Sequence, residues 1–422
     1  MAVTGTGSHL AAGDLALTVV SGGVCAARGF AVAGVRCGIK RKRRDIALLV
    51  ATGGDAVCAG VFTQNIVRAP CVDRNVAVLA EKPFARAVVV NAGNANAGNG
   101  ARGEADNAEM AQMAATALSV PANAVLTAST GVIGHPLPME RLAQGIAEAA
   151  GTLACTAEAA DHAAEAILTT DTFEKQFAVA VHLPESGIVV NIGGMAKGSG
   201  MIAPNMATML AFLTTDAAIT PAALHAALDA AVNVSFNCLT VDGDTSTNDS
   251  CFLLASGAAG NPVLADLTSA DGAAFTQALK QVCVHLAREV ARDGEGATKL
   301  VTVRVTGAPD TLAARKVAKT VAESPLVKTA LFGNDPNWGR ILAAAGRAGV
   351  PFDPKRATAH LAGTQIFAEG TPTDFDGPAL SRAMAAKEIE IAVDLGAGDG
   401  AAMVYTCDFS YDYVRINAEY HT

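Results

Sequence analysis

The order of strand-like and helix-like segments limits the folds open to this chain. Apolar runs typical of strands occur in groups, at roughly 45–51, 57–63, 86–91, 177–183, 187–192, 209–214, 250–255, 299–306, 388–394, 401–407 and 411–416. Helical periodicity falls between those groups, near 104–119, 138–150, 156–168, 221–232, 273–292, 312–322 and 336–348. A doubly wound sheet needs a helix after each strand, so this pattern favours a layered α+β fold.

Length and composition narrow the class of protein further. A chain of 422 residues predicts two or three lobes, and 51% apolar residues predict a large core. No apolar stretch approaches the ~18 residues of a membrane span, so we expect no membrane attachment. The first 27 residues lack lysine and arginine, unlike secretory and transit signals, and this predicts a cytoplasmic location. A net charge of −9 argues against a nucleic acid partner.

Nine cysteines and one basic run need separate interpretation. The cysteines form no Cys-x-x-Cys pair, which predicts reduced, mostly buried thiols rather than disulfides or a zinc site. The basic run is KRKRR at 40–44, directly before the apolar residues 46–50. We expect a solvated turn, because like charges in sequence stay in water; a nucleic-acid or localisation patch is the alternative.

The segment 193–210 combines glycines, one lysine and a small-residue–threonine junction, and it reads GGMAKGSGMIAPNMATML. A threonine hydroxyl needs an adjacent base before it can act as a nucleophile. Cutting the Ala207–Thr208 bond would give Thr208 such a base, its own α-amine, whose unperturbed pKa is about 7.7–8.0. By itself the segment also fits a surface loop before a buried strand.

Other motifs lie along almost the whole chain. They are NAGNANAG (91–98), STGVIG (129–134), TTDTF (169–173), VDGDTSTND (241–249), DGEGATK (293–299), FGNDPNWGR (332–340) and YDYVRIN (411–417). With segment 193–210, they resemble the ornithine acetyltransferase family, also called the bifunctional glutamate N-acetyltransferase family. The resemblance implies a helix–sheet–sheet–helix sandwich with a second, smaller lobe. It also implies a self-cleaved chain, with 1–207 as the α chain, 208–422 as the β chain, and an α2β2 assembly.

Thr130 and Gly131 follow an apparent strand at 123–127 and precede the helix expected near Pro138. A strand-to-helix turn exposes backbone N–H groups that can stabilise an oxyanion, although a turn glycine with a capping threonine has the same pattern. The resemblance implies that the Thr130 hydroxyl and the Gly131 N–H form the oxyanion hole.

Lys197 and Glu295 are charged residues within glycine-rich segments. The segment around Lys197 lacks the spacing of a phosphate-binding P-loop, so nucleotide binding is poorly supported. From their residue types alone, both could be solvated surface charges. The resemblance implies that Lys197 contacts a substrate α-carboxylate and that Glu295 contacts a substrate ammonium.

The remaining polar motifs divide into turns and substrate contacts. The acids of 242–249 do not follow an EF-hand register, so we expect turn hydrogen bonds near the site and no metal. The Asn/Gly segment 91–98 is explained by positive-φ turns, and it has Ala92 and Gly98 where the family more often has serine and cysteine. The resemblance makes substrate contacts of Thr169 or Thr170, with Thr170 favoured, and of Asn417 and Thr422. The His421 of this chain departs from the usual arginine.

The resemblance implies a ping-pong acyltransferase without a metal or an organic cofactor. Thr208 would take acetyl from N2-acetylornithine and pass it to glutamate, within arginine biosynthesis; the sequence leaves open whether acetyl-CoA is also a donor. One alternative is a self-cleaving amidase or aminopeptidase that uses water as the acceptor. The other is a binding protein that keeps the fold without the activity.

Overall fold

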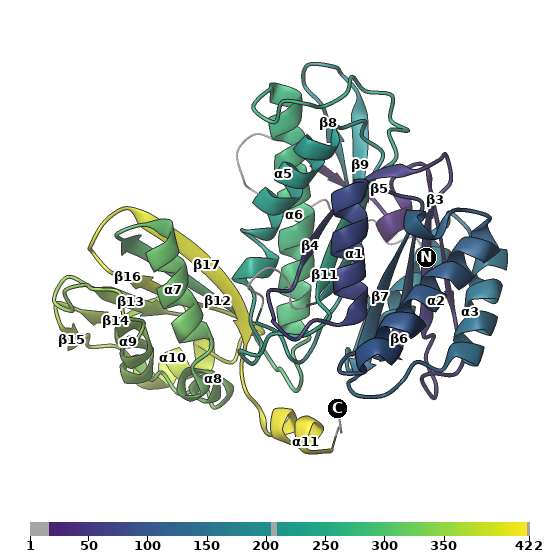
Figure 1. Ribbon diagram of the computed structural model, residues 1–422. Helices are drawn as coiled ribbons and strands as arrows, with labels where there is room; N and C mark the ends of the chain where they lie inside the picture. Colours follow the sequence, from purple (N-terminus) through teal and green to yellow (C-terminus); the bar gives the residue numbers. More distant parts are fainter. Residues whose placement is uncertain (1–16, 204–208, 420–422) are drawn as a thin grey trace, which may run out of the picture.

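A computed structural model describes residues 17–203 and 209–419 of the chain. Its main body contains two sheets, packed face to face (Figure 1). In spatial order the seven-stranded sheet contains β1 (Leu17–Val19), β8 (Lys175–His182), β9 (Val189–Lys197), β10 (Leu210–Thr215), β11 (Ser250–Ala255), β4 (Ala56–Phe62) and β5 (Phe84–Ala85). The four-stranded sheet contains β2 (Phe30–Val35), β3 (Ile46–Ala51), β6 (Ala87–Asn94) and β7 (Val125–Val132).

Helices cover the outer face of each sheet. The seven-stranded sheet packs against α5 (Pro221–Val232) and α6 (Ala270–Arg292). The four-stranded sheet packs against α2 (Gly100–Leu118) and α3 (Met139–Gly151). At the margins of the sandwich, α1 (Pro70–Glu81) contacts β4 and β7, and α4 (Ala157–Ala166) contacts β2 and β3. The helix–sheet–sheet–helix sandwich that the resemblance implied is therefore confirmed.

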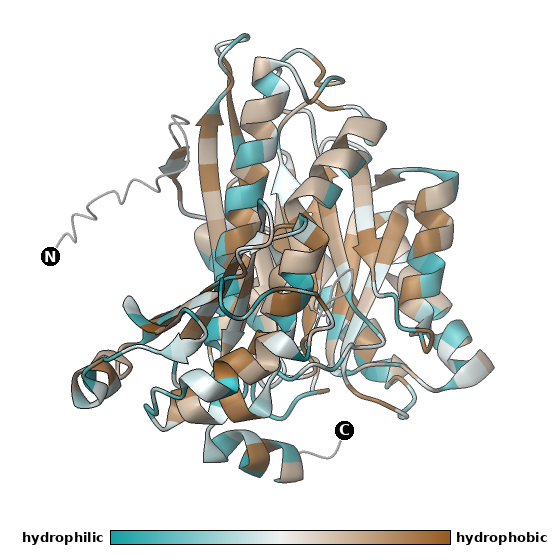
Figure 2. Cartoon of the chain, turned by 90° about the vertical axis from the view of Figure 1, so that its left-hand side faces the viewer, coloured by the Kyte–Doolittle hydropathy of each residue, from teal (hydrophilic) through white to brown (hydrophobic). Residues whose placement is uncertain are grey.

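Strand β10 shows how the residue pattern produces these layers. Successive side chains of a strand point to opposite faces of its sheet. Ala211 and Leu213 accordingly pack toward the helices, whereas Leu210 and Phe212 pack toward the second sheet. All six residues of β10 are buried, which explains its unbroken apolar run, and the strands of both sheets are largely apolar in Figure 2. The buried strands place Lys197 and Leu210 opposite each other, because β9 and β10 pair antiparallel.

A second, smaller lobe has its own hydrophobic core and lies at the left of Figure 1. Its sheet contains, in spatial order, β15 (Thr371–Pro372), β14 (Thr364–Ala368), β13 (Thr358–Leu361), β16 (Glu388–Asp394), β12 (Leu300–Ala308) and β17 (Gly400–Cys407). Its helices are α7 (Thr311–Ala322), α8 (Pro325–Phe332), α9 (Trp338–Gly346) and α10 (Gly377–Ala383). The smaller lobe was thus correctly expected. Short 3-10 turns are η1 (Gly23–Cys25), η2 (Ala122–Ala124) and η3 (Phe236–Cys238).

The expected strand at 411–416 is wrong, because these residues begin helix α11 (Tyr411–Glu419). The Ser410 hydroxyl accepts a hydrogen bond from the Asp412 N–H at the start of this helix. Tyr411 contacts the Phe332 ring at the end of α8, and Tyr413 stacks on Phe409 in the segment before α11. These aromatic contacts attach the helix to α8 and to the preceding segment. The other strand segments expected from the sequence, and all the helical ones, correspond to observed elements.

Most of the cysteines are buried, as the sequence predicted. All nine cysteines are free thiols, and six are buried, namely Cys58, Cys71, Cys238, Cys251, Cys283 and Cys407. Across the described ranges, no helix is both long enough and apolar enough to cross a membrane.

Candidate active site

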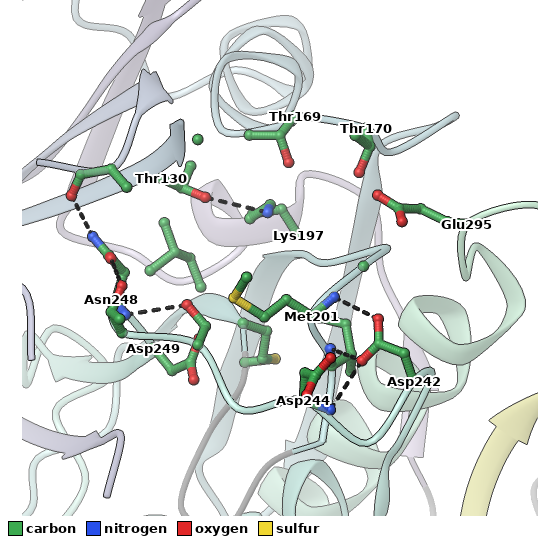
Figure 3. Close-up of a pocket in the computed structure, with 18 of the residues that line it drawn as sticks. Thr130, Thr169, Thr170, Lys197, Met201, Asp242, Asp244, Asn248, Asp249 and Glu295 are labelled. Carbon is green, nitrogen blue, oxygen red and sulfur yellow. Dashed lines mark hydrogen bonds between the residues drawn. The ribbon is translucent and has the colours of Figure 1, made fainter. Parts of the chain in front are cut away.

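A pocket of about 160 Å³ gathers side chains from segments far apart in the sequence (Figure 3). It is lined by residues at the end of β7, after α4, at the end of β9, at the start of β10, before β11, after α6 and on α11. Seven of the residues proposed or weighed as site residues from the sequence meet here: Thr130, Gly131, Thr169, Thr170, Lys197, Glu295 and Asn417. Ala207, Thr208 and Thr422 lie outside the described residues, but Met209 lines the pocket.

Thr130 and Gly131 lie within β7, so the expected strand-to-helix turn is wrong at this point. The strand continues to Val132 because its parallel pairing with β6 carries through Thr130 and Gly131. Gly131 has φ +130°, and a Cβ built on it would lie 2.3 Å from the main-chain carbonyl carbon of Gly93. Only glycine can combine this backbone conformation with so close an approach of two strands.

Lys197 is the last residue of β9 and is 8% exposed. Its Nζ donates a hydrogen bond of 3.3 Å to Thr130 Oγ1, and both groups face the pocket (Figure 3). Since Lys197 pairs with Leu210, its side chain starts beside the first residue of β10. The alternative of a solvated surface lysine is therefore wrong.

Glu295 follows α6 and is 6% exposed, which also excludes a solvated surface acid. Its backbone N–H donates to the Ser199 carbonyl oxygen at 2.9 Å. Its Oε2 accepts a hydrogen bond of 2.8 Å from Asn417 Nδ2 of α11. This contact brings the C-terminal helix to the pocket, so Glu295 and Asn417 form one edge of the site.

Thr169 and Thr170 both line the pocket, just after α4. The Thr169 N–H donates to Asp171 Oδ2 at 3.0 Å, which fixes the backbone between the helix and these two hydroxyls. That Thr170 is the substrate contact stays a prediction.

The basic run 40–44 supports this same corner, and the expected solvated turn is wrong for three of its side chains. Lys40 Nζ donates to the carbonyl oxygens of Ala166, at 3.2 Å, and Leu168, at 2.7 Å. Burial lowers the pKa of Lys40 to about 8. Arg43 donates to the Asp171 carbonyl oxygen and Arg44 pairs with Glu165. Lys40 thus binds the carbonyl-rich end of α4, where positive charge is favourable.

The segment 242–249 makes the turn hydrogen bonds that were expected near the site. The Asp242 carboxylate accepts from the N–H groups of Met201, at 2.6 Å, and Ile202, at 2.8 Å. Asn248 Nδ2 donates to the carbonyl oxygens of Ala95, at 2.6 Å, and Ser129, at 2.9 Å. These bonds hold the neighbouring loops together. In the described part of the chain, no group of three or more His, Cys, Asp or Glu side chains is placed to hold a metal.

Three further pocket residues were given no part in binding or catalysis from the sequence. Asp249 is 2% exposed, burial raises its pKa well above the ordinary value, and its Oδ2 has no hydrogen-bond partner among the described residues. Met201 has φ +56°. Burial and the carboxylates of Asp242, Glu295 and Asp244 raise the pKa of Tyr413. Of these three, only Asp249 was weighed from the sequence, as one of the acids of 242–249 that were expected to make turn hydrogen bonds.

The pocket can therefore bind a small molecule that carries both charges. One buried ammonium, Lys197, faces several carboxylates across the cavity, and threonine hydroxyls lie between them (Figure 3). Such an arrangement suits an amino acid better than a purely apolar ligand, because each charge finds an opposite partner.

Comparison with known proteins gives one consistent result. The ArgJ family matches residues 31–422. The arginine biosynthesis bifunctional protein ArgJ of Symbiobacterium thermophilum is 50% identical over 410 residues, which cover 96% of this chain and 99% of that protein. The protein of the same name from Synechococcus sp. is 47% identical over 413 residues, covering 96% and 98%. A solved chain of the Bacillus halodurans protein is 44% identical and covers 50% of this chain and 100% of its own length, with a TM-score of 0.49.

Proposed function

Because this chain belongs to the ArgJ family, whose members are acyltransferases of arginine biosynthesis, we propose that it moves acetyl from N2-acetylornithine to glutamate through an acetyl-Thr208 intermediate. The observation that carries this proposal is the meeting of Thr130, Gly131, Lys197 and Glu295 in one pocket beside Met209. Acyl transfer between two amino acids needs an oxyanion hole for the acyl oxygen, a cation for the substrate carboxylate and an anion for the substrate ammonium.

The nucleophile is produced by self-cleavage in this proposal. The Thr208 hydroxyl attacks the Ala207 carbonyl carbon and the Ala207–Thr208 C–N bond breaks, so that Ala207 is held as an ester on Thr208 Oγ and the hydroxyl proton passes to the new α-amine. Water then hydrolyses this ester, which leaves 1–207 with a terminal carboxylate and 208–422 with a free Thr208 hydroxyl. The new α-amine of Thr208 then serves as the base for its own hydroxyl. We further propose that the two chains assemble as α2β2 in the cytoplasm.

Acetyl transfer follows in two half-reactions. Thr208 Oγ adds to the acetyl carbon of acetylornithine, its proton moves to the α-amine, and the oxyanion is stabilised by the Thr130 hydroxyl and the Gly131 N–H. A donor of this kind contributes ~10²–10³ in rate. The C–N bond breaks as ornithine takes the proton from the α-amine. The neutral glutamate amine then attacks the acetyl carbon of acetyl-Thr208, the ester C–O bond breaks, and acetylglutamate leaves as the proton of its nitrogen passes through the α-amine to Thr208 Oγ.

Substrate recognition uses the charged edges of the pocket. Lys197 would bind the α-carboxylate of either amino acid and Glu295 the ammonium, with Thr170, Asn417 and Thr422 as further contacts. Opposite charges on Lys197 and Glu295 in the lining of one pocket would suit a zwitterion, which favours an amino acid over water as the acyl acceptor.

Two measurements test the proposal. Intact-mass analysis should find two chains separated between residues 207 and 208, and Thr208→Ala should stay uncut and inactive. Without glutamate, acetylornithine should lose no more than one acetyl group per active site, whereas continued turnover should need glutamate and give acetylglutamate as the product. Release of acetate at the same rate without glutamate would instead identify an amidase. Replacing acetylornithine by acetyl-CoA tests the second donor.

A further inference from the structure

The hydrogen bond between Lys197 and Thr130 fixes the direction of a hydroxyl hydrogen. A lysine ammonium has three N–H donors and no acceptor, so Thr130 Oγ1 must be the acceptor of the 3.3 Å contact. A threonine hydroxyl has one hydrogen, which remains free for another partner. Among the described residues, no acceptor takes that hydrogen within hydrogen-bonding distance of Thr130 Oγ1, and Thr130 lines the pocket (Figure 3).

The end of β9 that carries Lys197 is held from behind by a buried carboxylate. Asp171 is 2% exposed, and its Oδ1 accepts from the Gly198 N–H at 2.7 Å. The same oxygen accepts from Lys175 Nζ at 2.8 Å, and Lys175 also donates to Asp293 Oδ2 at 2.6 Å. Asp293 in turn accepts from Ser199 Oγ through its carbonyl oxygen, at 2.6 Å. The two residues after Lys197 are thus each tied to this cluster.

The charges of the cluster do not cancel within it. Two carboxylates, Asp171 and Asp293, share one ammonium, Lys175, so one negative charge is left in a buried place. Lys197 supplies the next positive charge. Burial raises the pKa of Asp171, but Lys175 and Lys197 outweigh this and hold it well below its ordinary value. A buried carboxylate and a buried ammonium stabilise each other's charged forms.

We infer that Lys197 acts as a positioning residue for the oxyanion hole: it occupies a lone pair of Thr130 Oγ1 and so directs that hydroxyl's hydrogen to the acyl oxygen, with Asp171 behind it as its counter-charge. The inference rests on the proposed function and deepens it, because it gives Lys197 a part in the chemical step in addition to substrate binding. Donation from a cation also polarises the Thr130 O–H, which strengthens its hydrogen bond to an oxyanion.

An acetyl donor without a carboxylate separates the two roles of Lys197. With p-nitrophenyl acetate, Thr208 Oγ adds to the acetyl carbon, the C–O bond to the aryl group breaks, p-nitrophenolate leaves, and the proton goes to the α-amine. The burst of p-nitrophenolate then measures acylation of cleaved protein. We expect Lys197→Met to slow the burst about 10-fold or more, and Thr130→Val about 100-fold. Lys197→Arg, which keeps the charge and the donors, should recover most of the rate, and Lys42→Met serves as the exposed-lysine control.

The double variant gives the decisive comparison. If Lys197 acts through Thr130, Lys197→Met should slow the burst of the Thr130→Val protein less than about threefold, since coupled residues are not additive. A Lys197→Met protein with the native burst rate, or a double variant whose losses multiply, would overturn the inference. The burst itself requires Thr208, whatever the role of Lys197. An unchanged burst in Thr208→Ala would therefore refute the proposed function and not the inference about Lys197.

Asp171→Asn keeps Lys197 and tests the counter-charge. Its side-chain oxygen can still accept from the Gly198 N–H, so we expect a folded, cleaved protein with a burst slowed several-fold and an unchanged half-saturation for ornithine. A native burst rate would remove Asp171 from the inference. If Lys197→Met stays uncut, this already supports a role in chemistry, because cleavage involves no substrate carboxylate, and Asp171→Asn then supplies the burst measurement.

Discussion

Gly131 shows how much a single residue constrains this site. Its φ of +130° excludes ordinary side chains, and its Cα faces the main chain of β6 instead of a side chain that could move. The resemblance indicated the residue, but not this reason for it. The close approach results from the pairing of Gly93 in β6 with Gly131 in β7. A local sequence pattern cannot predict this pairing, because the two residues are far apart in the sequence.

Gly131→Ala should therefore lower acetyl transfer by at least about 100-fold, because a displaced strand end carries both of the proposed oxyanion donors with it. The matched control is Gly134→Ala, where φ is +84° but no atom lies within 4 Å of the added Cβ. Single-turnover acetylation of both variants checks this. Equal, small losses would mean that the contact with β6 is not critical.

Asp249→Asn should change the pH dependence of stability. Burial raises the pKa of this carboxyl, so the folded protein keeps a proton that the unfolded chain loses above its pKa of about 3.9. Stability from this group is therefore lost as pH rises toward the folded pKa. The Asn variant has no such loss, so its free energy of unfolding relative to native should rise as the pH is raised from 5 to 8. If the thermal midpoints of Asp249→Asn and of the native protein differed by the same amount at pH 5 and at pH 8, this prediction would be contradicted.

At the scale of elements, the sequence predicted long, apolar segments well. The run Leu210–Thr215 is buried on both faces, and α6 has a broad apolar stripe with Ser269 capping its start. Strand β2 was not identified from the sequence, although its residues FAVAGV are apolar, and neither were the short strands β13 to β15. Helix α11 was missed because Tyr411, Tyr413, Val414 and Ile416 are residue types typical of strands. Its helical form depends instead on the Ser410 hydroxyl and on aromatic contacts with Phe332 and Phe409.

Helix α11 should serve binding more than stability. It has no buried residue, yet Asn417 reaches Glu295. A chain ending at Ser410 should keep its thermal midpoint within a few degrees, roughly the effect of 1 kcal/mol or less. Its half-saturation for ornithine and glutamate should rise about 10-fold or more, since a charge-assisted hydrogen bond at the site is lost. Asn417→Leu, which keeps the helix, should reproduce most of that rise. Normal binding by the shortened chain would refute the role of α11.

At the scale of the whole molecule, the two proposed chains interleave within one sheet. Strand β9 belongs to 1–207 and pairs with β10 from Leu210 to Thr215, whereas β4, also from the first part, pairs with β11. The core between the sheet and α5/α6 also draws residues from both parts. Separation would therefore break two strand pairings and a core together.

Cleaved protein should accordingly elute from a sizing column as one species that contains both chains, at about twice the mass of one full chain if the assembly is α2β2. The chains should separate only in denaturant, with one shared unfolding transition in the sandwich. Elution of 1–207 apart from 208–422 in native buffer would contradict this reading of the sheet.

The close approach of Gly131 to β6 also has a genetic consequence. Every missense change of a glycine codon introduces a residue with a Cβ, and here the opposing atoms belong to the main chain of residues 93 and 94. No shortening of a neighbouring side chain can make room, so second-site suppressors of such changes should be rare. We expect a saturation-mutagenesis screen for arginine prototrophy to find codon 131 closed to missense variation, while codon 134 tolerates several residues.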